Sequence, residues 1–253
     1  MIYTDAIVLK QIKTGEDRRI LVLFTDKLGK ISAASKTTYH SKSKSSAVLQ
    51  PFNYGRYTLY TGKDIYNISF GEVIKSFYKI GENIEKYAYC AYVLEFTDKI
   101  LAENQRDTYL FELLTDFLEI MEKRKKEYLL IVRAYEIKSL IHMGIMPQLN
   151  ECVRCGNSKN CFEFSIKEGG VICESCNSNS DDKLIYNINT NIIEVIQYIT
   201  NNSLKNLEKL RLEKKVLNEL NDLITAYIRY HIDLSNMKSI EFLNTCLADG
   251  EKG

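Results

Sequence analysis

The stretch at residues 18–35, RRILVLFTDKLGKISAAS, carries the clearest fold signal in the chain. Its first part, Arg18–Thr25, is a compact apolar run rich in the residues that strands favour. The segment Asp26-Lys27-Leu28-Gly29 has the composition of a turn, and a second apolar run follows it over residues 30–35. We therefore predict an antiparallel hairpin at this place.

Three further runs also resemble strands, and they cover residues 4–12, 49–60 and 65–75. Pro51 and Gly55 suit an edge or a bulge in the fourth strand. Five strands joined by short turns are typical of a small barrel such as the OB-fold. The sequence thus predicts an N-terminal OB-fold domain over residues 1–80.

Beyond Gly81 the apolar residues recur with the spacing of helices. The expected helices cover residues 84–104, 107–121, 127–143, 191–200, 207–232 and 237–246. Asp107 is placed to cap the second helix, and Gly144 with Pro147 marks the end of the third. We predict an α+β multi-domain fold, in which an all-α domain over residues 81–253 carries a Cys-rich insertion at about residues 150–180.

The composition excludes several broad classes of protein. Of 253 residues, 45% are hydrophobic and 26% are charged, with only 12 Gly and 2 Pro, so the chain is not disordered, collagenous or of low complexity. No run approaches the ~18 uncharged apolar residues that span a bilayer. The first residues contain an acid and lack the basic segment of a signal peptide. We predict a cytoplasmic protein without a membrane partner.

The net charge of +1 hides an uneven distribution. Residues 1–80 hold 13 Lys and Arg against 6 Asp and Glu, whereas residues 81–150 and 151–253 each carry a net charge of −3. From Lys27 to Lys63 there are seven basic residues and no acid. This pattern indicates an anion-binding surface, for which nucleic acid is the usual partner. The alternative is a solvated face on which the cations cluster by chance.

The most specific motif is C-x2-C-x17-C-x2-C, formed by Cys152, Cys155, Cys173 and Cys176. Each Cys-x-x-Cys pair can direct two sulfurs toward one point, and Zn²⁺ takes four of them in a tetrahedron. Gly156 and the Gly169-Gly170 turn allow the tight chain reversals that this requires. Four thiolates leave no position for a reactive water, so we predict one structural Zn²⁺.

Two other interpretations of these cysteines remain open. They could form two disulfides, although a cytosolic chain keeps its thiols reduced. They could also form a redox pair of the thioredoxin type, although the surrounding sequence lacks the βαβ pattern of that fold. Cys161 lies between the pairs and is expected to be a free thiol beside the site.

A second candidate site is the polar segment at residues 36–46, predicted to be an exposed loop with Tyr39 and His40 at its tip. Lysines and hydroxyls can bind phosphates, and an aromatic ring can stack on a base. Lys36, Lys42 and Lys44 are spaced among its hydroxyl residues, and Arg18, Arg19 and Lys30 flank the same predicted barrel in sequence. The alternative is a flexible loop whose lysines serve only solubility.

The basic run at residues 123–126, with Arg133 beyond it, could receive an acidic peptide or could simply be a solvated helix end. We find no Ser-His-Asp arrangement, paired carboxylates or phosphate-binding glycine loop in the sequence. The prediction is therefore a protein that is not an enzyme.

Taken together, the chain resembles the bacterial DNA repair and recombination mediator family RecO. The residues that carry the resemblance lie at 6–10, 15–21, 24–30, 41–43, 49–52, 136–140, 144, 147, 169–173 and, more weakly, 234–243, together with the two cysteine pairs. Apart from the cysteines no single motif is specific, but their order and spacing cover most of the chain.

The resemblance implies an OB-fold, a helical domain with a zinc module and no catalysis. It implies binding of single- and double-stranded DNA and annealing of complementary strands. It also implies contact with the acidic C-terminal tail of the single-stranded DNA-binding protein. Together with RecR, such a protein would help RecA load onto DNA that the single-stranded DNA-binding protein covers. Carried over residue by residue, the family's basic DNA surface falls on Lys10, Arg18, Arg19, Lys30, Lys36, Lys42 and Lys44. Lys126 and Arg133 are the residues expected to receive the acidic tail.

The sequence departs from the family pattern in two places. Thr37-Thr38-Tyr39-His40 stands where a glycine and two arginines are expected, which removes two cations that could bind phosphate. Ile240 stands in place of an arginine. Two other classes therefore stay open: an RNA-binding or transcription accessory factor with an OB-fold and a zinc module, and a Cys-x-x-Cys redox enzyme.

Overall fold

The structure is a computed structural model that describes residues 1–14, 18–36, 47–178 and 184–250. The chain divides into two compact units. The first consists of Met1–Lys126 together with Leu234–Gly253, and the second of Glu127–Asp233. Among the described residues, no helix is both long enough and apolar enough to cross a membrane.

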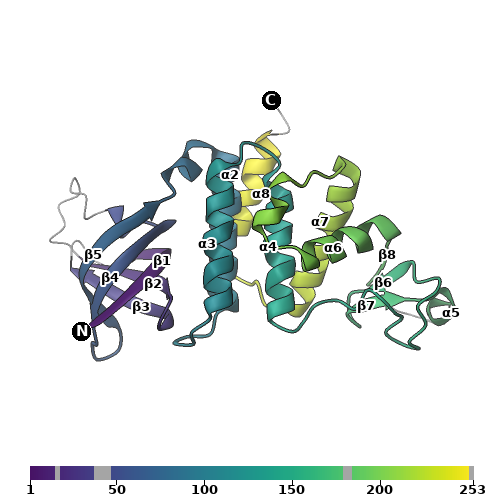
Figure 1. The fold of residues 1–253 in the computed structure, drawn as a ribbon, viewed down its shortest axis with the longest axis horizontal. Helices are drawn as coiled ribbons and strands as arrows, with labels where there is room; N and C mark the ends of the chain where they lie inside the picture. The colour runs from purple at the N-terminus through teal and green to yellow at the C-terminus, as the bar shows by residue number, and fades with distance from the viewer. Residues whose placement is uncertain (15–17, 37–46, 179–183, 251–253) are drawn as a thin grey trace. The chain divides into compact units, whose positions relative to one another are not determined.

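The first unit begins with five strands that close into a barrel (Figure 1). They are β1 (Ile2–Lys13), β2 (Arg18–Thr25), β3 (Gly29–Lys36), β4 (Asn53–Tyr60) and β5 (Tyr66–Ser76). The order around the barrel is β1-β2-β3-β5-β4, and β4 pairs with β1 to close it. Only the contact between β3 and β5 is parallel. This arrangement confirms the prediction of an OB-fold.

The barrel closes around alternate residues of its strands, as the two-residue period of a strand requires. Val8, Leu21, Leu23 and Leu59 lie fully inside it. The fourth strand starts at Asn53 rather than at residue 49, because Leu49 turns into the core. Gly55 lies at a break in the β4–β5 register, so the predicted bulge is confirmed there, whereas Pro51 lies before the strand.

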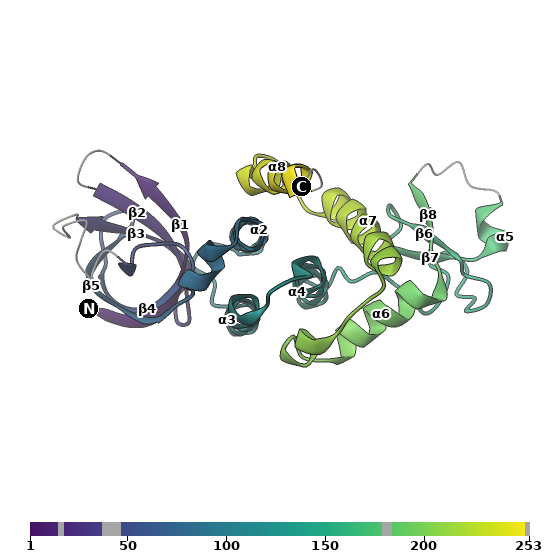
Figure 2. The same ribbon diagram turned by 90° about the horizontal axis from the view of Figure 1, so that it is seen from above.

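Three longer helices and one short turn of 3-10 helix complete this unit. They are η1 (Tyr78–Glu82), α2 (Ile84–Ile100), α3 (Thr108–Lys123) and α8 (Lys238–Gly250). The carboxylate of Asp107 accepts a hydrogen bond from the backbone N–H of Leu110, which confirms the predicted cap of α3. Helix α8 packs against α2, although the two are far apart in sequence (Figure 2).

The second unit combines helices with a small sheet. Its elements are α4 (Tyr128–His142), β6 (Glu163–Ser165), β7 (Gly170–Ile172), α5 (Glu174–Asn177), β8 (Ile185–Asn187), α6 (Thr190–Asn201), η2 (Lys205–Lys209) and α7 (Lys214–His231). The three strands form a sheet in the order β7-β6-β8. The sequence analysis did not predict these strands, because runs of three residues carry no periodicity.

One predicted helix is wrong in its extent. The helix expected over residues 207–232 is broken, since η2 ends at Lys209 and α7 starts only at Lys214. Leu207 is fully buried by the short turn, and the guanidinium of Arg211 donates to the backbone carbonyls of Glu208 and Leu210. These contacts stabilise an extended chain where the apolar spacing alone favours a continuous helix.

Candidate metal centre and nucleic-acid interface

The four predicted cysteines meet at one place in the second unit. The Sγ atoms of Cys152, Cys155, Cys173 and Cys176 all lie within 4.8 Å of one another. Four sulfurs at ~2.3 Å from a central ion would be separated by distances of this order. All the cysteines in the structure are free thiols, so the disulfide interpretation is not supported. The donor set therefore fits a tetrahedral metal ion of the kind that thiolates prefer.

Local backbone contacts explain why the first pair of sulfurs converges. The N–H of Gly156 donates to the carbonyl of Cys152 at 2.8 Å, and Gly156 has a φ of 72°. A residue with a side chain is strained in this left-handed conformation, so glycine suits the turn. The N–H of Cys152 donates in turn to the carbonyl of Asn157 at 2.8 Å. Together these bonds close the tight loop that the sequence predicts.

The second pair is brought to the first by β7. The N–H of Val153 donates to the carbonyl of Val171 at 3.0 Å. A Cβ at Gly170 would lie 2.5 Å from Val153 Cγ1 and 2.6 Å from the carbonyl oxygen of Gln148, so only glycine permits this approach. Cys173 directly follows β7, and Cys176 lies on α5. The Gly169-Gly170 turn thus returns the chain to the site, as predicted.

The surroundings favour the thiolate form of one ligand. The hydroxyl of Ser175 lies 3.2 Å from Cys173 Sγ, and this hydrogen bond is the main reason why the pKa of Cys173 is lowered to about 6. A thiolate is the form that binds a metal. Cys161 packs beside the cluster and donates to the carbonyl of Asn157 at 3.2 Å, as expected for a free thiol outside the ligand set.

The predicted DNA-binding residues differ in their exposure and in their place on the barrel strands. Lys10 is exposed on β1, and Arg19 is half-buried on β2 directly opposite Lys13. Arg18 and Lys36 are paired at the neighbouring ends of β2 and β3. Lys42 and Lys44, with Tyr39 and His40, lie outside the described residues. Lys13, which the sequence did not single out, is also exposed, and strand pairing places it beside Arg19.

Lys30 lies in a different environment. It is 8% exposed, and its ammonium group lies 3.3 Å from the carboxylate of Asp98 and 3.1 Å from that of Glu103. It also donates to the backbone carbonyl of Asp98 at 2.7 Å. A phosphate would have to displace these partners to reach it. Its predicted contact with DNA is untested, and this geometry counts against it.

The two residues expected to receive an acidic tail lie in different units. Lys126 is exposed at the end of the first stretch of the first unit. Arg133 is buried in the second unit, with its guanidinium 2.6 Å from the carboxylate of Glu136, which is completely buried. Their role in binding a partner stays a prediction.

A closed OB barrel with cations on two neighbouring strands, in a chain that also holds a four-thiolate cluster, defines the class of OB-fold proteins with an added metal module. Family models assign the chain within that class. The model described as the N terminus of recombination protein O matches residues 1–77, and the model of its C terminus matches residues 81–241. The chain belongs to the recombination protein O family, RecO.

Curated relatives agree with this assignment over nearly the whole length. A protein named DNA repair protein RecO from Alkaliphilus metalliredigens is 35% identical over 95% of this chain and 98% of its own. Proteins of the same name from Caldicellulosiruptor saccharolyticus and Acetivibrio thermocellus are 34% and 31% identical, over 95% and 96% of this chain and 97% and 96% of their own.

Proposed function

We propose that this protein is a non-enzymatic recombination mediator in DNA repair. In this role it binds single- and double-stranded DNA and anneals complementary strands. With RecR it helps RecA load onto DNA covered by the single-stranded DNA-binding protein. The observation that carries the proposal is the closed OB barrel, with exposed Lys10 and Lys13 and half-buried Arg19, in a chain of the RecO family. Relatives named DNA repair protein support it.

The proposed mechanism is electrostatic. Cations on the barrel neutralise phosphates and release condensed counterions, so that two strands can approach each other with less repulsion. Lys10, Arg18, Arg19, Lys36, Lys42 and Lys44 form the proposed footprint, and the exposed Lys13 extends it. Lys30 is left out, because its charge is already paired with two carboxylates.

The proposed metal is Zn²⁺, with a structural role. Four thiolates complete its coordination, and metal binding would supply folding free energy to a segment that has few large apolar residues. The proposed location is the cytoplasm, where the protein joins the nucleoid when it acts on DNA. Its loading activity would depend on the acidic tail of the covering protein, which would concentrate it on coated strands.

The deciding experiment is an annealing assay with two complementary oligonucleotides coated with the cognate single-stranded DNA-binding protein. We expect the protein to accelerate annealing, and we expect the acceleration to be lost when the coating protein lacks its C-terminal tail. If folded, zinc-loaded protein gives no acceleration, the mediator role is wrong. A preference for structured RNA in a parallel binding assay would then favour the RNA-binding alternative.

A second experiment addresses the footprint. Reversal of the charges of Lys42 and Lys44 to Glu should flatten the dependence of log K for DNA on log salt, because each lost phosphate contact lowers the slope by about 0.7 to 0.9. The same reversal at Lys214 and Lys215, exposed on α7 in the other unit, provides the matched control. An unchanged slope would remove residues 42 and 44 from the footprint.

A further inference from the structure

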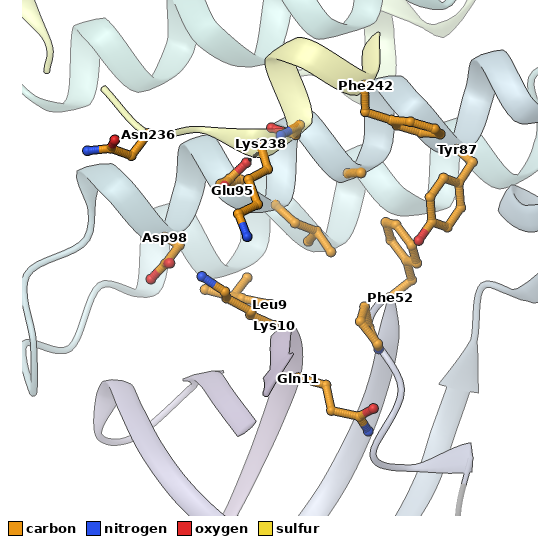
Figure 3. Close-up of a pocket in the computed structure, with 14 residues that line it drawn as sticks. Leu9, Lys10, Gln11, Phe52, Tyr87, Glu95, Asp98, Asn236, Lys238 and Phe242 are labelled. Carbon is orange, nitrogen blue, oxygen red and sulfur yellow. Dashed lines mark hydrogen bonds between the residues drawn. The ribbon is translucent and has the colours of Figure 1, made fainter. Parts of the chain in front are cut away.

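A cleft of about 530 Å³ lies within the first unit, between β1, the turn before β4, α2 and α8 (Figure 3). Its volume is within the usual range of small-molecule and cofactor sites. Leu9 and Leu94 contribute to its apolar surface, and Phe52, Tyr87 and Phe242 contribute aromatic rings. The proposed DNA contacts use only Lys10 among its lining residues.

The three rings are arranged edge to face rather than in a stack. Tyr87 meets Phe52 at 5.3 Å between ring centroids and an angle of 69°, and it meets Phe242 at 6.1 Å and 86°. Phe52 holds a left-handed backbone with a φ of 68°, a conformation that tends to occur at binding sites. Tyr87 and Phe242 are each 37% exposed, so a flat apolar group can reach their rings.

Two lysines converge on the mouth of the cleft. Figure 3 shows the side chains of Lys10, from β1, and Lys238, from the start of α8, directed into the same opening. Both residues are exposed, and neither forms an ion pair with any part of the chain that the structure describes. Two carboxylates also line the cleft: Glu95 accepts the N–H of Ser239 at 2.8 Å, and Asp98 pairs with Lys30. Lys10 and Lys238 are therefore the groups at the mouth that can pair with a phosphate.

We propose that this cleft binds one nucleotide of a single DNA strand, with its base against Tyr87 and Phe242 and its flanking phosphates between Lys10 and Lys238. The inference rests on the proposed function and deepens it. A base needs only a flat apolar surface, an occasional hydrogen bond and cations for its phosphates. An extended peptide would instead need partners for its own backbone, and β1 already pairs with β2 and β4 on its two edges.

The position of Lys10 connects the cleft to the proposed footprint. Lys10 and Lys13 lie on the same strand, and Lys13 is paired with Arg19 on β2. A strand that follows these cations along the barrel would reach the aromatic rings through Lys10. Holding one base out of the chain would expose the neighbouring bases for pairing, which suits an annealing protein.

The test measures affinity by fluorescence anisotropy for labelled oligo(dT) and for an abasic strand with the same number of phosphates. Phe242→Ala should weaken the binding of oligo(dT) by about tenfold, because a base stacked on an aromatic ring contributes about 1–3 kcal/mol. The same substitution should leave the abasic strand unaffected. Tyr198→Ala is the matched control, since Tyr198 is an exposed aromatic residue on α6 of the other unit.

The charge is tested with Lys238→Glu. This substitution should weaken the binding of both strands and should lower the slope of log K against log salt by about 0.7. Lys79→Glu provides the control, since Lys79 is an exposed lysine of the same unit that does not line the cleft.

Two results would distinguish a failure of the proposed function from a failure of the nucleotide site. If the unmodified protein binds neither strand, the proposed function itself is wrong. If it binds oligo(dT) but the cleft variants behave like their controls, only the nucleotide site is wrong. Loss of binding to an acidic, aromatic peptide in the cleft variants, with DNA binding intact, would also overturn the nucleotide site and assign the cleft to a protein partner.

Discussion

Two lysines of the barrel, Lys30 and Lys10, lie in different environments and have different expected roles. Lys30 and Lys10 both lie on barrel strands within the basic residues 1–80. The structure buries Lys30 against two carboxylates, whereas Lys10 is exposed beside the cleft. Lys30 thus joins β3 to α2, and Lys10 remains available to a ligand.

We expect Lys30→Ala to lower the free energy of unfolding by about 2 kcal/mol, because it leaves the partly buried carboxylate of Asp98 without its cation. Lys10→Ala should change stability by less than about 0.5 kcal/mol and should weaken DNA binding instead. Urea denaturation and fluorescence anisotropy measure the two effects. Equal stability of the two variants would show that the Lys30 ion pairs do not stabilise the unit.

Among the elements, the β2–β3 turn depends on a close approach that no short motif describes. Gly29 has a φ of 72°, and a Cβ there would lie 2.0 Å from the carbonyl oxygen of Gln105. The hairpin is predictable from its own residues, but the segment that packs on it lies beyond the end of α2, at Gln105.

Gly29→Ala should therefore destabilise the protein by at least about 2 kcal/mol, since it combines left-handed strain with a clash against backbone. Gly81→Ala is the control, because nothing lies within 4 Å of its Cβ position. Thermal unfolding followed by circular dichroism measures both variants. If the Gly29→Ala variant unfolds at the same temperature as the Gly81→Ala variant, the close packing of this turn is contradicted.

The segment that holds the four cysteines and the strands β6, β7 and β8 has too few apolar side chains to form a stable core by itself. Its three strands have three residues each, and such a sheet is marginal without further support. Phe164 is the large side chain buried in β6. The cysteines supply the missing constraint when a metal joins them.

Cys173→Ser should reduce the bound zinc to less than about a tenth and should expose residues 150–178 to protease, because structural zinc supplies folding free energy. DNA affinity should change little. Cys246→Ser, which alters a free cysteine on α8, is the control. Metal analysis and limited proteolysis measure the outcome, and normal zinc content in Cys173→Ser would refute the four-ligand assignment.

In the whole molecule, the end of the chain returns to complete the first unit. Residues from Leu234 onward group with the barrel and its adjoining helices, although more than a hundred residues of the second unit intervene. Helix α8 covers α2 and contributes Lys238, Ser239 and Phe242 to the cleft. The predicted division into a domain of residues 1–80 and a domain of residues 81–253 stays a prediction.

We expect deletion of residues 234–253 to increase amide hydrogen exchange in α2 by at least about tenfold, because α2 loses the apolar cover of α8. Exchange in β6, β7 and β8 should stay unchanged, since they belong to the other unit. Hydrogen exchange with mass spectrometry measures both regions. Unchanged protection of α2 would show that α8 contributes little to this unit.

The predictions from sequence that are confirmed rest on local chemistry. Strand alternation, the cap at Asp107 and the two Cys-x-x-Cys pairs each depend on residues a few positions apart, where backbone geometry is set by neighbours. The strand β2 was predicted with its observed bounds, Arg18–Thr25, for this reason. The barrel followed because five such strands can bury their apolar faces in few other ways.

The features that the sequence does not signal depend on residues that are distant in the chain. The burial of Lys30 and the return of α8 both arise from packing between separate elements. Burial and free charge are properties of a surface, and a surface is formed only when elements meet. The local code of this chain therefore specifies its barrel strands, most of its helices and its clustered cysteines, while the packing of β1, α2 and α8 creates its cleft.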